Sequence, residues 1–184
     1  MADSPARRLI LVRHAKSAWP DVADHDRPLA PRGRRDAPAA GRWLSAAGCV
    51  PDRVLCSTAL RARQTWQLAA EELGARPQTT FERRVYGATS AGLLDLARQT
   101  PTESRTLLIV GHDPAVQQLT LELAGARPGN GDADAITRVR VKFPTAAIAV
   151  LAFTGAWSQL APGQARLTSF AVPGDFRSGR GATP

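Results

Sequence analysis

The sequence predicts a three-layer α/β/α sandwich with a mostly parallel central sheet and an antiparallel C-terminal edge. Three observations lead to this fold class. Short apolar runs alternate with helix-like segments over the first two thirds of the chain, as they do when strands are joined by helical crossovers. The run at 9–12 is unbroken, and so is the run at 106–110 after its first residue, which is typical of strands covered on both faces. The last apolar runs are joined by connections too short for helical crossovers, so we expect antiparallel strands there.

The length and composition of the chain fit a single domain. Its 184 residues are 43% hydrophobic, which is enough to form a core without disulfides or bound metals. No internal repeat or domain boundary is evident, so we interpret residues 1–184 as one domain and expect residues 173–184 to form a disordered tail. The N-terminal segment lacks the apolar core of a signal peptide, and the longest apolar run, 146–153, is too short to span a bilayer. We therefore expect no association with a membrane.

The net charge limits the classes of partner that we expect, and the cysteines indicate the cellular compartment. The formal net charge is +8, and 22 of the 24 basic residues are arginines. This balance is compatible with phosphates, nucleic acid or acidic proteins as partners. The chain has no nucleic-acid motif and only 5% aromatic residues, so we expect no nucleic-acid partner. Cys49 and Cys56 are seven residues apart and Cys56 lies in an apolar run, which makes a poor disulfide framework and favours a reducing cytoplasm.

The first 124 residues predict four strands, each followed by a helix. The strand-like runs are 9–12, 53–56, 79–81 and 106–110, and the segments with helical periodicity are 32–47, 59–73, 91–99 and 114–124. Gly48 and Gly74 end the first two helices, Ser90 can cap the third, and Pro114 fits the first turn of the fourth. Pro38 either marks the true first turn of its helix or kinks it.

The last third of the chain predicts a loop and three strands. Residues 125–137 are rich in Gly, Asp and Asn, so we interpret them as a loop. Strand-like runs follow at 138–143, 146–153 and 165–172. These runs would form the antiparallel edge of the sheet.

Basic side chains follow the predicted strands. Arg13 and His14 come directly after the first strand, Arg61 lies in the first turn of the helix after the second, and His112 follows the strand at 106–110. Ligands of open α/β sheets bind beyond the carboxyl ends of the strands. We therefore expect these four side chains to meet at one edge of the sheet.

Two arginines and two imidazoles around one point form an anion site, and phosphate is the anion that they match best. Arginine offers paired planar donors for phosphoryl oxygens. His14 can attack phosphorus and carry the phosphoryl group as a phosphoramidate, while His112 and the arginines stabilise charge on the equatorial oxygens. The arginines already supply positive charge, and the sequence shows no compact cluster of metal ligands. We therefore expect neither a metal nor another cofactor.

Three short motifs carry a resemblance to a known family. "LVRHAKSAW" resembles the R-H-G signature of the histidine phosphatase superfamily, the phosphoglycerate-mutase-like enzymes. "CSTALRARQT" resembles its second signature, whose arginine falls on Arg61, and "VGHDP" resembles the third, which carries His112. The motifs occur in the family's order. The resemblance implies that His14 is the phosphoryl-accepting nucleophile and that Arg13, Arg61 and His112 form the phosphate pocket.

Within this superfamily the chain looks most similar to the short phosphohistidine phosphatases of the SixA type. "DRPLAPRG", "VYGATSAGLL" and "FPTAAIAVLAF" all resemble that branch. Ala15 stands where the superfamily usually has glycine, and Pro20 stands where mutase-like members carry asparagine. The spacing from Arg61 to His112 leaves little room for the helical cap of the mutases. The resemblance thus implies a phosphoglycerate-mutase-like fold without a large cap, and a shallow pocket suited to a phosphate presented on a protein.

The proton donor to the leaving group stays open between two carboxyl groups. Glu82 lies near the place of the mutase glutamate in the loosely matching "FERRVYG", and Asp24 stands near an acidic residue of the SixA type. The nitrogen of a phosphoramidate leaves readily once protonated, so a strong general acid is not required. The lack of a clear acid therefore favours phosphohistidine over an alkyl phosphate ester.

Several nearby residues keep two interpretations. Arg63 rivals Arg61 on composition, and only the motif register favours Arg61. Ser17 can contact phosphate or lie on the surface, and Trp19 can line the mouth of the pocket or pack against the protein. His25, between two aspartates, is interpreted as a solvated loop residue.

The leading hypothesis is a cytoplasmic, metal-independent phosphatase that hydrolyses protein phosphohistidine through a covalent intermediate on His14. We expect it to act as a monomer or weak dimer. The first alternative is a phosphatase of the same superfamily that acts on small phosphorylated molecules. The second is a module that binds phosphate or nucleic acid without turnover.

Overall fold

A six-stranded sheet forms the centre of the computed structural model, which describes residues 6–125 and 132–176. The strand order is β3-β2-β4-β1-β5-β6. β1 to β4 pair in parallel, whereas β5 and β6 run antiparallel to their neighbours. The predicted fold class is therefore confirmed. The strand bounds are β1 (Arg7–Arg13), β2 (Arg53–Ser57), β3 (Gln78–Glu82), β4 (Thr106–Gly111), β5 (Ile148–Phe153) and β6 (Arg166–Ala171).

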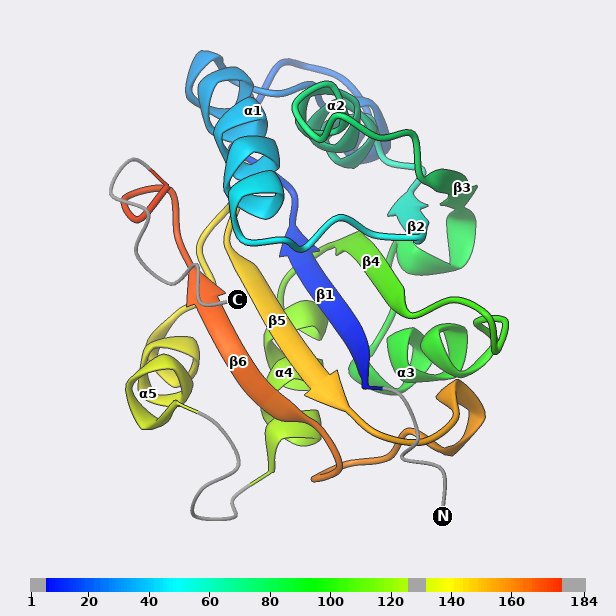
Figure 1. Cartoon of the computed structure of the whole chain (residues 1–184). Helices are drawn as coiled ribbons and strands as arrows, with labels where there is room; N and C mark the ends of the chain where they lie inside the picture. The colour runs from blue at the N-terminus through cyan, green and yellow to red at the C-terminus, as the bar shows by residue number, and fades with distance from the viewer. Residues whose placement is uncertain (1–5, 126–131, 177–184) are drawn as a thin grey trace.

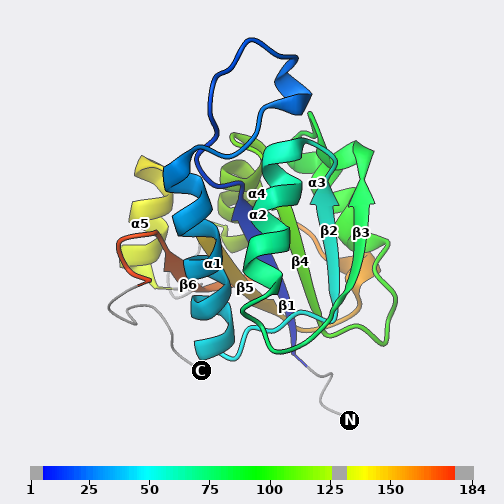
Figure 2. The same cartoon turned by 90° about the horizontal axis from the view of Figure 1, so that it is seen from above.

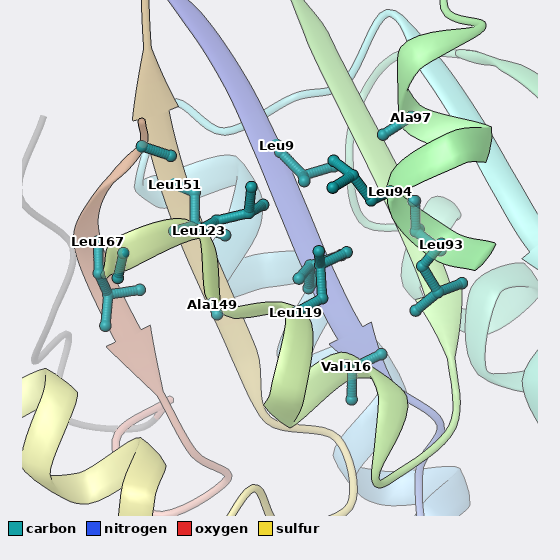
Figure 3. Packing of buried hydrophobic residues seen from close by; sticks show 14 of the residues in the cluster. Leu9, Leu93, Leu94, Ala97, Val116, Leu119, Leu123, Ala149, Leu151 and Leu167 are labelled. Carbon is teal, nitrogen blue, oxygen red and sulfur yellow. The ribbon is translucent and has the colours of Figure 1, made fainter. Parts of the chain in front are cut away.

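Helices cover both faces of this sheet (Figures 1 and 2). α1 (Pro31–Ala46) and α2 (Leu60–Ala70) pack on one face, and α3 (Ser90–Arg98), α4 (Ala115–Ala124) and α5 (Ala133–Val141) pack on the other. Figure 3 shows how the leucines of α3 and α4 pack against β1 and β5 on the second face. Short 3₁₀ turns lie in the connecting loops at η1 (Asp24–Asp26), η2 (Arg83–Val85) and η3 (Trp157–Gln159).

The elements of the first 124 residues lie where the sequence predicts them, with ends shifted by a few residues. The largest difference is in α2, which ends at Ala70 rather than at 73. Pro38 does not mark the first turn of α1, because the helix begins at Pro31 and continues past Pro38. Pro31 occupies the first turn, where its missing N–H has no helical partner to lose.

The prediction of a strand at 138–143 is wrong, because most of this segment belongs to α5. Residues 133–137, predicted as loop, form the start of the same helix. Asp132 caps it by accepting hydrogen bonds from two backbone N–H groups of its first turn. The alternating valines imitate a strand, but Ala135 and Val139 are buried one helical turn apart, while Val141 is 81% exposed. The face that carries Ala135 and Val139 packs against α4 and β6, and this packing favours a helix over a strand.

The segment after β6 starts with a turn. Residues 173–176 follow the strand, and Asp175 accepts hydrogen bonds from Val172 N–H and from the Arg138 guanidinium. The rest of the predicted tail, 177–184, lies outside the described residues, as do 126–131 of the predicted loop. None of the helices in the described ranges combines the length and the apolar character that crossing a membrane requires.

The loop between β1 and α1 folds back against the start of its helix. Ala30 N–H donates to Lys16 O at 2.8 Å, and Ser17 pairs with Leu29 in an isolated bridge. A β carbon on Gly33 would lie 2.1 Å from Lys16 O, so only glycine allows α1 to approach the loop this closely. Figure 2 shows the outer part of this loop standing above the carboxyl ends of the parallel strands. The loop therefore forms one wall of the site described next.

Candidate active site

The carboxyl ends of β1, β4 and β2 lie side by side and bring the strand-end side chains together. His14 N–H donates to Gly111 O at 3.1 Å, which joins the ends of β1 and β4. The imidazole rings of His14 and His112 are 5.1 Å apart between centroids. Arg61 reaches His14 from the first turn of α2, and Arg13 is the last residue of β1. The structure thus brings the two histidines and two arginines to one edge of the sheet.

His14 presents the lone pair of one ring nitrogen to the site. Its Nδ1 lies 2.8 Å from Ala15 O. A carbonyl oxygen only accepts, so this contact places the proton of the neutral ring on Nδ1 and leaves Nε2 unprotonated. Nε2 accepts a hydrogen bond from Arg61 Nε at 3.3 Å. Burial lowers the pKa of His14 to about 3, helped by the charges nearby, so the ring is neutral at pH 7.

His112 is held by a side chain at the end of the neighbouring strand. Its Nε2 lies 2.7 Å from Ser57 Oγ, which also accepts a hydrogen bond from Ala59 N–H. The edge of the Tyr86 ring packs against the imidazole, with 5.6 Å between centroids. Burial lowers the pKa of His112 to about 4, and the charge of the nearby arginines adds to this. His112 is therefore also neutral at pH 7.

Arg13 is anchored by the backbone that enters β5. Its Nη1 donates to Phe143 O at 2.7 Å and lies 3.8 Å from an oxygen of Asp113. Its Nε is buried and has no hydrogen-bond partner among the described residues. A buried donor without a partner costs about 1–3 kcal/mol.

A strained residue ties the same backbone segment to the strand-end histidine. Ala146 has a φ of 63°, in the left-handed region that favours glycine. This conformation costs an alanine about 1–2 kcal/mol. It lets Ala146 N–H donate to the carbonyl oxygens of Arg13 at 3.1 Å and His14 at 3.2 Å. The strained conformation of Ala146 therefore goes together with hydrogen bonds to the backbone of both site residues.

Arg61 is fixed on three sides. Its Nη1 donates to Asp24 O at 2.6 Å, its Nη2 donates to Asp24 Oδ2 at 3.0 Å, and its Nε donates to His14. Thr65 bonds Arg61 O through its hydroxyl and accepts from Ala15 N–H, which links α2 to the end of β1. The Arg61 side chain is 8% exposed. One edge of its guanidinium therefore bonds Asp24, while Nε faces His14 Nε2.

Asp24 is the centre of a hydrogen-bond network in the β1–α1 loop. Its carboxylate accepts from Arg27 Nη1 at 2.9 Å, from the Tyr86 hydroxyl at 2.9 Å and from Arg61. These bonds, that of Arg27 first, hold the pKa of Asp24 well below its usual range. The carboxyl group is therefore ionised at neutral pH and acts as an acceptor in this arrangement.

Two other predicted residues are engaged elsewhere. Ser17 Oγ accepts from Arg27 Nη2 at 2.7 Å, so it supports the loop that carries Asp24. Glu82 accepts from the backbone N–H and the guanidinium of Arg84, which lowers its pKa. Glu82 lines a separate cavity together with residues of β2 and α3. Glu82 does not join the cluster around His14.

The structure separates the two rival arginines of α2 and places the exposed tryptophan. Arg63 is exposed, and its guanidinium lies over the ring of Phe81, 5.5 Å from the centroid, whereas Arg61 faces His14. Trp19 is 78% exposed, and the buried Arg27 guanidinium stacks on its ring at 3.2 Å. Trp19 therefore neither packs in the core nor contacts the two histidines directly.

Sequence reasoning missed the residues that support the cluster. Ser57 carried a signal, because it directly follows the predicted strand at 53–56 and precedes Arg61 closely. Tyr86 and Arg27 carried none, because only folding brings them to Asp24. The interpretation of His25 as solvated is incomplete: its ring is 40% exposed, but it bonds Thr58 Oγ1 at 3.0 Å and packs against Tyr86.

The chemistry of this arrangement is that of a phosphoryl-transfer site. A neutral imidazole with an unprotonated nitrogen stands beside two fixed guanidinium groups and a second imidazole. Such groups bind an anion and stabilise the charge of a transferring phosphoryl group. The fold and the site together define the class: a phosphatase built on an α/β sandwich.

The comparisons with known proteins identify the family. A profile of the histidine phosphatase superfamily (branch 1) matches residues 9–84. An uncharacterized protein of Mycobacterium tuberculosis is 45% identical over 163 residues, which cover 88% of this chain and 99% of that protein. The chain belongs to the histidine phosphatase superfamily, and it is a phosphatase.

Solved structures of similar proteins narrow the comparison within the family. A candidate phosphohistidine phosphatase SixA from Nakamurella multipartitia superposes with a TM-score of 0.79 at 37% identity, over 93% of this chain and 98% of that chain. A second candidate SixA, from Agrobacterium tumefaciens, has a TM-score of 0.76 at 29% identity, over 91% and 98%. The chain is thus similar to SixA-type structures over nearly its whole length.

Proposed function

We propose that the protein hydrolyses phosphohistidine on a protein substrate, through a covalent phosphohistidine intermediate on His14 and without a metal ion. The observation that carries the proposal is the state of His14. Its Nδ1 is bonded to a backbone carbonyl, and its Nε2 lone pair faces Arg61 inside an anion-binding edge. Nearly complete burial keeps this ring neutral and therefore nucleophilic.

In the proposed reaction, an oxygen of the phosphoryl group replaces His14 Nε2 as the acceptor of the Arg61 Nε hydrogen bond. Nε2 then forms a bond to phosphorus as the phosphorus–nitrogen bond of the substrate breaks. The substrate imidazole carries a proton from solvent on its other ring nitrogen, so its bridging nitrogen takes the electron pair of the broken bond and the ring leaves in the neutral form. Water attacks the phosphorus next, which releases inorganic phosphate and regenerates His14. Arg13, Arg61 and His112 stabilise the equatorial oxygens in both steps.

The ionised state of the two candidate proton donors favours phosphohistidine over a phosphate ester as the substrate. Asp24 and Glu82 both have lowered pKa values because arginines donate hydrogen bonds to them, so both are ionised at neutral pH. An alkyl phosphate ester needs an acid to protonate its leaving oxygen, whereas a phosphoramidate nitrogen is protonated easily. We assign Asp24 a positioning role: it holds the guanidinium of Arg61 beside His14.

The lack of a helical cap in the described stretch between Arg61 and His112 favours a protein as the substrate. All residues between Arg61 and His112 are described, and they form α2, β3, η2, α3 and β4, with α3 packed into the core on the sheet. The carboxylate side chain of Asp24, at the rim, is 51% exposed. The SixA names of the similar structures point to phosphohistidine as the substrate class.

The compartment and the assembly follow as part of the proposal. Cys49 and Cys56 are both buried free thiols, which agrees with a reducing cytoplasm. A monomer or weak dimer without a nucleic-acid partner stays the prediction for the assembly.

The test compares two substrates in the presence of EDTA: a phosphohistidine peptide and p-nitrophenyl phosphate. We expect rapid hydrolysis of the peptide and slow hydrolysis of the ester. The variant His14→Ala should lose at least about 10³-fold of the peptide activity, because the nucleophile is removed. Circular dichroism and thermal unfolding of the variant control for folding.

Each other outcome removes a named part of the proposal. Undiminished hydrolysis by His14→Ala would exclude His14 as the nucleophile. Loss of activity in EDTA, restored by a divalent cation, would exclude the metal-independent mechanism. Faster hydrolysis of the ester than of the peptide would assign the protein to small phosphate esters instead.

A further inference from the structure

The edge strand β3 and helix α2 border a groove outside the site described above. In the described part of the chain, β3 pairs with β2 on one side only, and both views of the fold show it at the edge of the sheet (Figures 1 and 2). Two cavities of about 620 and 600 Å³ lie between this strand and α2. They share most of their walls, including Trp66, Ala70 and Thr79.

The backbone of β3 is available for pairing along this groove. Gln78 N–H donates to Asp52 O on the side of β2. Because backbone groups alternate along a strand, those of Thr79 and Phe81 point away from β2, toward the open edge. The side chains of the same two residues line the groove. An added strand would therefore gain main-chain hydrogen bonds and side-chain contacts at the same positions.

The apolar and charged residues of the groove indicate which kind of segment can bind there. Phe81 is 44% exposed, and Arg63 lies over its ring. Arg34 and Arg76 line the two cavities, against a single acidic lining residue, Glu71. An apolar floor with three arginines around it complements an extended segment that alternates acidic and β-branched residues.

A second copy of the chain does not fit the same edge. Two β3 strands would pair antiparallel about a twofold axis. Arg76 lies at the amino end of β3 and Arg63 lies at its carboxyl end. The twofold arrangement would place Arg76 of each copy against Arg63 of the other copy. Like charges in contact oppose this pairing.

The groove leads to the proposed phosphoryl-transfer site. The last residue of β3, Glu82, pairs in register with Ser57, and Ser57 holds His112. A strand added beyond β3 would lie four strand positions from β1, which corresponds to about 19 Å at the spacing of neighbouring strands. About six extended residues cover that distance.

We propose that the groove between β3 and α2 docks an extended acidic segment of the phosphorylated protein substrate as an additional strand, while its phosphohistidine reaches His14. The docking role rests on the proposed function, since it names the part of the same substrate that lies outside the phosphate site. Arg63, Phe81 and the open edge of β3 make the contacts.

The test uses phosphohistidine peptides that differ only in a distant segment. A linker of six Gly/Ser residues joins the phosphohistidine to five residues that alternate glutamate and valine, placed before it in one peptide and after it in another. The control peptides carry lysine in place of glutamate. We expect the KM of one acidic peptide to be about tenfold lower than that of its lysine control, with the same kcat.

Three variants of the full chain locate the effect. Arg63→Glu and Phe81→Ser should each abolish the difference in KM between acidic and lysine peptides. Arg166→Glu makes the same charge change on β6, at the opposite edge of the sheet, and should keep the difference. Hydrolysis of the small phosphoramidate ion should be unchanged in all three, which also shows that each variant is folded.

The outcomes separate the docking role from the proposed function. Equal KM values for acidic and lysine peptides in the unaltered protein, with normal hydrolysis, would overturn docking and leave the proposed function standing. An equal loss of the KM difference in Arg166→Glu would show a general charge effect and also overturn it. If no phosphoramidate is hydrolysed, the proposed function fails, and fluorescence anisotropy of the labelled unphosphorylated peptides then decides docking alone. A dimer in sedimentation that Arg63→Glu strengthens would assign the edge to a second copy and overturn docking of a substrate.

Discussion

The parallel and antiparallel halves of the sheet contribute to the site in different ways. The parallel strands β1, β2 and β4 end at one edge and deliver side chains there: two histidines, two arginines and a serine. The antiparallel half starts β5 at the same edge and contributes backbone instead. Phe143 O anchors the Arg13 guanidinium, and Ala147 O accepts from Arg13 N–H at 3.1 Å. The direction of the strands therefore divides the molecule into a parallel half, which supplies the side chains of the site, and an antiparallel half, which supplies backbone groups that hold them.

This division is useful because the two halves should respond differently to substitution. Changes in the core of the antiparallel half should lower stability and leave the chemistry of the folded protein intact. Changes in the network at the parallel edge should lower activity and leave the fold intact. The three predictions that follow test this contrast, in order of decreasing effect.

The largest expected effect is on stability, from Leu151→Ala in β5. Leu151 is fully buried and packs against α4 on the sheet (Figure 3). Removing its buried side chain should lower the free energy of unfolding by about 2–5 kcal/mol. Urea denaturation measures this loss. At a temperature where the variant is folded, its kcat on a phosphohistidine peptide should stay within about twofold, a difference worth less than 1 kcal/mol. A tenfold fall in kcat there would break the division between the halves.

The next effect is on activity, from Asp24→Asn. The variant keeps an acceptor but loses the charge that holds Arg61, so the guanidinium is less well placed beside His14. Small displacements of positioning groups cost up to about 10²-fold, so we expect kcat/KM to fall by about 10- to 100-fold for phosphohistidine peptide and p-nitrophenyl phosphate alike. Tyr86→Phe removes one bond to the same carboxylate and should give a smaller loss of the same kind.

An alkyl phosphate ester distinguishes positioning from proton donation, because its leaving oxygen needs a proton whereas p-nitrophenolate does not. If Asp24 is the general acid, Asp24→Asn should slow the alkyl ester far more than p-nitrophenyl phosphate or the phosphoramidate, and should remove one limb of the pH–rate profile. Glu82→Gln serves as the matched control, because its carboxylate contacts Arg84 instead of the site. We expect it to retain activity on both substrates.

The effect that is smallest at neutral pH, and that grows as the pH falls, is the dependence of stability on pH. The folded pKa values of His14 and His112 are about 3 and 4, below the value of about 6.5 in an unfolded chain. As pH falls below 6.5, the unfolded state binds protons that the folded state cannot. The stability is therefore full above pH 6.5 and is lost progressively toward pH 4, by about 1–3 kcal/mol per pH unit near pH 5.

Denaturation in urea at pH 7, 6 and 5 measures this slope. His14→Asn should reduce it, because one of the two buried imidazoles no longer takes up a proton on unfolding. The lowered pKa of Asp24 acts in the same direction but only at lower pH, where its carboxyl group is protonated in the unfolded chain. A stability that does not change between pH 7 and pH 5 would contradict the buried, neutral state of the two histidines.

The sequence predicted more about the site than about the C-terminal third. Motifs at the ends of parallel strands must meet at one edge, so the grouping of His14, Arg61 and His112 followed from their order in the chain. The segment at 133–143 gave no such constraint. Its alternating valines satisfy a strand locally, and only contact with α4 and β6 selects the helix that buries Ala135 and Val139. Local periodicity is weaker than packing when the two disagree.

By itself, the sequence determined the fold class, the parallel arrangement and the edge at which the candidate site lies, because strand direction and covalent order leave few topologies. Tertiary structure alone decided how the groups at this edge are paired. The Asp24 carboxylate bonds Arg61, Arg27 and Tyr86, and in the described part of the chain β3 has one unpaired edge. These features depend on distances between residues far apart in the chain. Burial and hydrogen bonding, which set the charge of each group, exist only once those distances are closed.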